Sequence, residues 1–360
     1  MNSPAPSHQR VYILDLLRFI AAFGVMLYHY TWRLPTVDHL GGPQFPELDG
    51  WTRYLHLGVQ LFFIISGFVI AFSAEGKTAG QFAWSRFVRL YPAYWLCLII
   101  TFAFCHYLWR PHFELSIRDG LINLTMFQAY FKVPHVEWAY WTLAEELRFY
   151  ILVALLLALK QWHRMLAFVA VWMVLCFIDI FKHVPLAHYE MALDQAPFFA
   201  AGMVYYDAFK RGFRPVHWLL IAVTAALGCK RFLDWSYHDA IERHAVCSPV
   251  VVVCILLSMH LVFIGIASHK LAIRKNFALL TMAGGMTYPL YLIHNRVGFS
   301  TIIAIEPVMG RWKALVLTCL GALVLAYGIW KFWELPFAAL LRRMKGRSAG
   351  QPELTKPVPM

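Results

Sequence analysis

The chain has 360 residues, of which 60% are hydrophobic and only 14% are charged, against roughly 45–50% and about 25% in soluble globular domains. The mean hydropathy is +0.56, and the apolar residues gather in blocks of about twenty, the length of a membrane-spanning helix. These values exclude a water-soluble enzyme, a disordered protein and a coiled coil. The net charge of +12 does not indicate nucleic acid, because the basic residues lie in short clusters between apolar blocks.

The apolar blocks predict an all-α, polytopic integral membrane protein with about ten transmembrane helices in one bundle. No pair of halves looks repeated, which disfavours an inverted-repeat transporter. Asp15 and Arg18 lie in the first block and no small-residue cleavage site follows, so we expect a retained helix and not a signal peptide. The ten predicted segments are 11–31, 55–74, 88–109, 139–159, 163–182, 191–209, 215–232, 247–267, 277–303 and 312–334.

The loops between these segments differ in charge. Basic residues favour the two tails and every second loop, whereas acidic residues gather in the alternate loops. Basic loops stay on the cytoplasmic side of a membrane. We therefore expect both termini in the cytoplasm, with tails at 1–10 and 337–360.

Two polar residues of the first segment lie on one helix face. Arg18 and His29 are eleven residues apart, close to three helical turns, which places them about 16 Å apart along the axis. Taken alone, His29 favours a core histidine bonded to a neighbouring helix over a catalytic one. Arg18 alone is compatible with a structural ion pair to Asp15, one turn away.

The fourth and ninth segments carry further ionisable groups, which are costly in lipid. Glu145 and Glu146 are adjacent and point about 100° apart, so at most one faces a given pocket; a salt bridge to Arg148 is as compatible with the pattern as a catalytic carboxylate. His294 belongs to the ninth segment. With His29 and Glu146 it is expected in the outer half of the bilayer, which predicts one shared polar cavity suited to general-base chemistry.

Two more features come from the second and third segments. Arg86 and Arg89 share a helix face and can hold a phosphate, or can be ordinary cytoplasmic basic residues. Ser66 lies in an apolar span, where small residues usually serve packing. The sequence has no nucleophile elbow and no phosphate-binding glycine loop. It has no persuasive metal-ligand spacing either, so we expect no metal and no prosthetic group.

Six motifs in order resemble the acyltransferase 3 family of bacterial membrane-bound carbohydrate O-acyltransferases. The first is Arg18 with His29, which looks like the family's Arg-x10-His. FFIISGFVI, RFVRLYPAYW and YPLYLIHNRVG look like further family stretches, as does WELPF with Glu334. WTLAEELRFY resembles the family's Trp-Ser/Thr-Leu-x-x-Glu pattern, with the glutamate at Glu146 and not Glu145. The resemblance covers roughly residues 11–336, the expected membrane-embedded domain.

The resemblance implies a multi-pass protein of the bacterial inner membrane that transfers an acyl group, expected to be acetyl, from cytoplasmic acyl-CoA to a hydroxyl of a cell-surface or exported carbohydrate. The sequence shows no appended esterase-like domain, so either a separate extracytoplasmic protein completes the transfer or the membrane domain acts alone. Membrane lipids are the other expected partners. The predicted catalytic residues are His29, Glu146 and Arg18, and the predicted substrate-binding residues are Arg86, Arg89, Trp141, Tyr150, His294 and Ser66.

Two alternatives stay open. A transporter or exporter would use His29, Glu146 and His294 as a proton or substrate relay. The other superfamily of membrane-bound acyltransferases has a His and Asn pair, which His294 and Asn295 mimic. That second alternative leaves the pairing of Arg18 with His29 unexplained.

Overall fold

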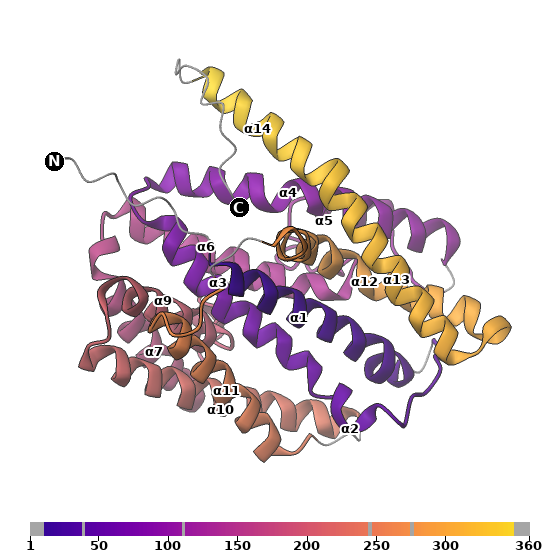
Figure 1. Ribbon diagram of the computed structural model, residues 1–360, viewed down its shortest axis with the longest axis horizontal. Helices are drawn as coiled ribbons and strands as arrows, with labels where there is room; N and C mark the ends of the chain where they lie inside the picture. Colours follow the sequence, from indigo (N-terminus) through magenta and orange to yellow (C-terminus); the bar gives the residue numbers. More distant parts are fainter. Residues whose placement is uncertain (1–10, 38–39, 110–111, 244–246, 274–276, 349–360) are drawn as a thin grey trace.

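The computed structural model describes residues 11–37, 40–109, 112–243, 247–273 and 277–348, and all regular elements within them are helices (Figure 1). The predicted all-α fold is confirmed. The α-helices are α1 (Tyr12–Tyr28), α2 (Asp49–Thr52), α3 (Gly58–Ala74), α4 (Ala79–Ala103), α5 (Ile117–Asn123), α6 (Trp141–Ala158), α7 (Met165–Phe181), α8 (Pro185–Glu190), α9 (Ala196–Arg211), α10 (Pro215–Arg243), α11 (Pro249–Ala267), α12 (Ala278–Met309), α13 (Arg311–Ile329) and α14 (Leu335–Ser348).

Short π-helical and 3-10 turns extend or connect several of the α-helices. Wider π-helical turns follow α1, α4 and α13, at His29–Arg33, Phe104–Leu108 and Trp330–Glu334. Such turns are rare and occur often at functional sites. The first of them begins at His29. Four 3-10 turns complete the helical elements, at Leu34–Thr36, Leu55–Leu57, Trp138–Tyr140 and Trp162–Arg164.

Each of the ten predicted segments coincides with a long helix of the structure. Seven helical stretches are long and apolar enough to cross a membrane, and they contain α1, α3, α4, α7, α10, α11 and α13. The helices α6, α9 and α12 fall outside this set; α9 has only 16 residues, and α6 carries Glu145, Glu146 and Arg148. The protein is an integral membrane protein, while the count of ten crossings and the side of each terminus stay predictions.

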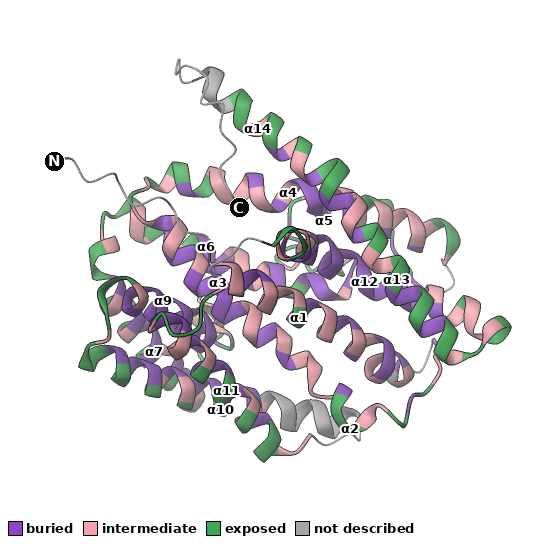
Figure 2. Ribbon diagram, in the orientation of Figure 1, coloured by how far each residue is buried: buried purple, intermediate pink, exposed green. Residues whose placement is uncertain are grey.

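The helices with most buried residues form the centre of the bundle (Figure 2). Helix α1 packs between α3 and α12, and α9 packs along the other side of α3. Gly67 and Gly202 allow this last approach, because a Cβ on either residue would lie 2.1 Å from a backbone oxygen of the facing helix. Helices α7 and α10 then cover α9, and α13 lies along α12.

The chain stays helical beyond the last predicted span. The sequence predicts a span that ends at 334 and a basic tail over 337–360, and residues 311–348 form one helical run from α13 through the π turn into α14. Figure 1 shows α14 projecting beyond the rest of the bundle. The predicted tail at 1–10 and the final residues 349–360 lie outside the described residues.

Candidate active site

A cavity of about 520 Å³ lies at the end of the bundle that holds His29, which we call the histidine end. Helices α1, α3, α9, α10 and α12, with the start of α6, contribute its walls. Aromatic rings line much of it, and charged and polar groups face one another across it. The lining residues are Val25, Tyr28, His29, Arg33, His56, Val59, Gln60, Trp138, Ala139, Trp141, Glu145, Asp194, Gln195, Phe198, Arg231, Phe232, Tyr291 and Asn295.

His29 meets His294 at the wall of this cavity, with 2.9 Å between His29 Nδ1 and His294 Nε2. His294 is fully buried. The Tyr30 hydroxyl donates to the His294 carbonyl oxygen at 2.7 Å, which ties α1 to α12 beside the histidine pair. The two histidines, which the sequence analysis placed at one depth of the membrane, are therefore in direct contact.

The partners of His294 define where the protons lie. Its Nδ1 is 3.2 Å from the Leu290 carbonyl oxygen and 2.9 Å from the Tyr291 carbonyl oxygen. Carbonyl oxygens only accept, so His294 Nδ1 carries the proton and, in the neutral ring, its Nε2 accepts. His29 Nδ1 is then the donor between the two rings. The Nε2 atom of a neutral His29 is left with a free lone pair.

Glu146 bonds to residues further along α3 and α6. Its Oε1 accepts from the Ser66 hydroxyl at 2.7 Å and from the Tyr150 hydroxyl at 2.6 Å. Ser66 is six residues beyond Gln60 on α3, which is about 9 Å further from the cavity along the helix axis. Of the three residues expected to share one cavity, His29 lines this one, whereas Glu146 and His294 are not among its lining residues; the shared cavity stays a prediction.

The carboxylate that faces the cavity belongs to the neighbouring residue, Glu145. Glu145 lines it and accepts from Arg148 Nη1 at 2.5 Å. The reason is the angle of about 100° between successive side chains of a helix: when Glu146 turns toward α3, Glu145 turns toward the cavity. Trp141, predicted to bind substrate, also lines the cavity and is 41% exposed.

The predicted arginines form a second polar cluster, with Glu146 and Tyr150, toward the opposite end of the bundle, which we call the arginine end. Arg86 Nη2 donates to the Ser73 hydroxyl at 2.9 Å and lies 6.0 Å from the Tyr150 ring centroid. Arg89 instead pairs with Glu334. The two arginines therefore have different partners.

Arg18, on α1, lies at the arginine end and is paired with Asp15, as the sequence analysis considered. Its Nη1 lies 3.9 Å from an Asp15 oxygen.

Arg296 and Glu137 hold the loop before α6 against α12. Glu137 accepts the Trp138 N–H at 2.9 Å and the Arg296 N–H at 3.0 Å. Burial raises the pKa of the Glu137 carboxyl to about 7, although the Arg296 charge and the backbone N–H groups lower it. Arg296 is 6% exposed, and its guanidinium lies 4.7 Å from the Phe113 ring centroid.

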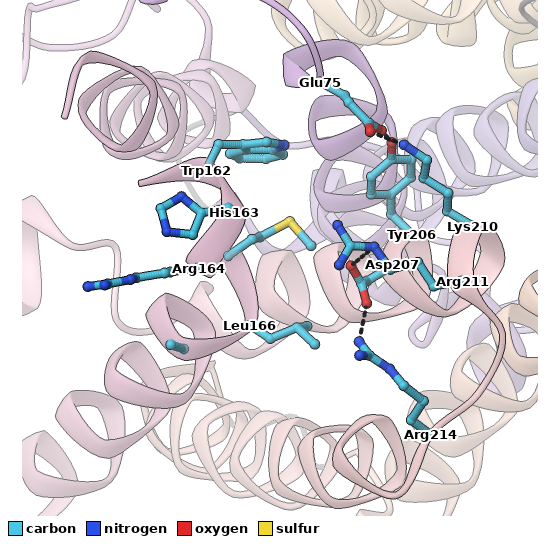
Figure 3. A pocket seen from close by; sticks show the side chains of 12 residues that line it. Glu75, Trp162, His163, Arg164, Leu166, Tyr206, Asp207, Lys210, Arg211 and Arg214 are labelled. Atoms are coloured by element: carbon cyan, nitrogen blue, oxygen red, sulfur yellow. Dashed lines mark hydrogen bonds and ion pairs between the residues drawn. The ribbon is translucent and has the colours of Figure 1, made fainter. Parts of the chain in front are cut away.

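A second, basic cavity of about 350 Å³ opens at the arginine end (Figure 3). Figure 3 shows Lys210 directed at Glu75, and Arg211 and Arg214 directed at Asp207. Most of its cations are therefore paired. The lining residues are Glu75, Trp162, His163, Arg164, Met165, Leu166, Ala167, Tyr206, Asp207, Lys210, Arg211 and Arg214.

The sequence analysis did not identify several of the residues that line the cavity. His56, Asp194 and Arg231 lie in the second, sixth and seventh apolar segments without a motif around them. Glu145 was set aside in favour of Glu146. Adjacent charged residues at the start of a span were a usable signal for Glu145. No sequence signal pointed to the other three, because each reaches the cavity only through the packing of α3, α9 and α10.

Comparison with known proteins identifies the family of this helical membrane bundle. A family model described as an acyltransferase domain matches residues 11–337. This match covers most of the chain and therefore shows its family. The protein belongs to the acyltransferase 3 family, as the motifs had indicated.

A relative and the solved structures add the following. The chain is 28% identical over 167 residues to "Acyltransferase MdmB" of Streptomyces mycarofaciens. The matched region is 44% of this chain and 41% of that protein, so the chain spans less than half of that relative's length. No solved structure matches the chain.

Proposed function

We propose that the protein transfers an acyl group, acetyl by preference, from cytoplasmic acyl-CoA to a hydroxyl group of a cell-surface or exported carbohydrate at the bacterial inner membrane. The observation that carries this proposal is His29: its Nδ1 lies 2.9 Å from His294 Nε2, and the ring borders a cavity. A histidine with one nitrogen held and the other free is arranged as a general base.

The proposed reaction begins at that free nitrogen. His29 Nε2 takes the proton of the acceptor hydroxyl while the oxygen attacks the thioester carbonyl carbon. The new C–O bond forms, the C–S bond breaks, and the departing CoA sulfur receives the proton from His29. In the alternative sequence His29 Nε2 attacks the thioester first and carries the acyl group before passing it to the hydroxyl.

His294 and Tyr30 position the base in this proposal. When His29 becomes an imidazolium, its Nδ1–H still donates to His294 Nε2. The His294 ring is itself fixed, because its Nδ1–H donates to carbonyl oxygens of α12. A fixed ring direction is what orients a general base. Trp141 and the other aromatic walls offer flat apolar surfaces of the kind on which sugar rings stack.

We assign the donor to the arginine end. Arg86 supplies a cation for the donor's phosphates, together with Arg18 and Arg89, and cations at such positions bind phosphate oxygens. Glu146, Tyr150 and Ser66 lie between these arginines and the cavity along α3 and α6, which is where the pantetheine arm would pass. The acceptor enters from the histidine end.

The test uses protein in nanodiscs with radiolabelled acetyl-CoA and a crude surface-glycan extract. We expect free CoA and labelled glycan in equal amounts, and label retained on the protein if His29 carries the acyl group. A parallel experiment with sealed vesicles asks whether label reaches the lumen without a covalent acceptor. Transport without CoA release would contradict the proposal and favour the transporter alternative.

A further inference from the structure

Three possible metal ligands meet beside the cavity, outside the proposed reaction centre. Asp179 lies in the last turn of α7, His183 follows the end of that helix, and His188 belongs to α8. One ligand atom from each lies within 4.8 Å of the other two. From this geometry we propose that these side chains form a zinc site.

The distances suit a tetrahedral ion. Asp179 Oδ1 is 3.6 Å from His183 Nδ1, and Asp179 Oδ2 is 2.8 Å from His188 Nδ1. Zinc bonds to nitrogen and oxygen are about 2.0–2.2 Å, which sets tetrahedral ligand atoms about 3.4 Å apart. A sub-ångström change in the three positions therefore accommodates the ion, with water as the fourth ligand.

The ligand types select zinc over the lighter divalent cations. Two imidazoles and one carboxylate suit Zn²⁺, whereas Mg²⁺ and Ca²⁺ require oxygen ligands. His183 is 60% exposed and His188 is 26% exposed, so an ion can enter from solvent. Asp179 is buried and provides the fixed side of the site.

A second group of contacts fixes the aspartate. The Val184 N–H donates to Asp179 Oδ1 at 3.1 Å, and Arg231 Nη2 donates to Oδ2 at 2.6 Å. The Arg231 charge weakens cation binding, and it lies on Oδ2, the oxygen 2.8 Å from His188 Nδ1. Asp179 would therefore bind the ion through Oδ1, the oxygen that faces His183. Asp194 shares the same guanidinium at 3.4 Å, so the two carboxylates and one arginine carry a net charge of −1.

The site lies directly behind the wall of the cavity. Arg231 and Asp194 both line that cavity, and His188 Nε2 is 3.2 Å from an Asp194 oxygen. Zinc would hold the end of α7 and α8 in one arrangement, and with them the position of Arg231 and Asp194. The assignment itself does not depend on acyl transfer.

The experiment measures zinc binding without any activity assay. Tag-free protein in nanodiscs is first treated with chelator. It is then titrated with Zn²⁺ against a fluorescent zinc indicator, in a buffer that contains millimolar Mg²⁺. We expect one Zn²⁺ per chain, and a Kd at least tenfold higher in His183→Ala and in His188→Ala. The matched control is His112→Ala, which removes another exposed histidine from a connecting segment.

Two results would overturn the site. The first is no uptake of Zn²⁺ by the wild-type protein at micromolar concentrations. The second is uptake that neither His183→Ala nor His188→Ala weakens, while the variants elute as folded protein in size-exclusion chromatography. His183 is mostly exposed, so its replacement is compatible with an intact fold.

Discussion

At the scale of single residues, the histidine pair depends on a close contact between α1 and α12. Tyr30 is fully buried and its ring lies against Gly298, where a Cβ would come within 2.0 Å of the hydroxyl oxygen. The same hydroxyl bonds the His294 carbonyl. Gly298 therefore provides the space in which Tyr30 holds His294 opposite His29.

His135 gives a prediction about pH at the same scale. Its imidazole lies outside the predicted spans, and Gln128 Nε2 is 2.8 Å from its Nδ1. Burial, together with the charges of Arg296 and Arg148, lowers the pKa of His135 to about 4. Between about pH 6.5, the value for an unperturbed histidine, and pH 4, the unfolded chain binds a proton that the folded protein does not. His135 therefore has no cost to the stability of the folded protein above that range. As the pH falls through it, protonation of the unfolded chain lowers the free energy of unfolding.

The measurement compares the thermal unfolding of wild type and His135→Gln in detergent from pH 7.5 to pH 4.5. Glutamine does not titrate, so the difference in Tm should shift in favour of the variant as the pH falls. A Tm difference that stays constant over this range would contradict the prediction.

At the scale of helices, the contact of α3 with α9 fixes the centre of the bundle. Gly67 faces Gly202, and a Cβ on Gly202 would lie 2.1 Å from the Ile64 carbonyl oxygen. We expect Gly202→Ala to force the two helices apart and to cost about 1–3 kcal/mol of stability, the usual cost of overpacking. Thermal unfolding in detergent measures the loss.

The matched control is Gly328→Ala on α13. A Cβ at Gly328 would have nothing within 4 Å, and alanine favours a helix over glycine, so its Tm should stay the same or rise. Equal Tm values for the two variants would show that the α3–α9 approach is not tight.

The helices and the site differ in how far sequence could predict them. Long apolar runs such as 247–267 identify a helix because burial in lipid requires both length and hydrophobicity. The pairing of Glu146 with Ser66 depends instead on the rotation of α6 against α3, which no local pattern encodes. The spacing of Arg18 and His29 is a local pattern and predicts a shared helix face. The contact of Arg231 with Asp179 joins α10 to α7, and no local pattern predicts it.

At the scale of the whole molecule, the charge distribution predicts the orientation in the membrane. Lys210, Arg211 and Arg214 gather at the arginine end, and basic residues favour the cytoplasmic side. Alkaline phosphatase fused after Glu190 should be active, since this position lies in a predicted outer loop, and the same enzyme fused after Ser348 should be inactive. The reverse pattern, or equal activity at both positions, would contradict the predicted topology.

The central claim is that the free nitrogen of His29 performs the transfer, and one rate tests it directly. The measurement is the rate of CoA release from acetyl-CoA, with glycan acceptor, by His29→Ala in nanodiscs against wild type and against His112→Ala. His112 is an exposed histidine that lines neither cavity and serves as the control. Loss of a general base costs about 10²–10⁴-fold, so the account predicts at least a hundredfold loss in His29→Ala and near wild-type release in His112→Ala. CoA release by folded His29→Ala within tenfold of wild type would contradict it.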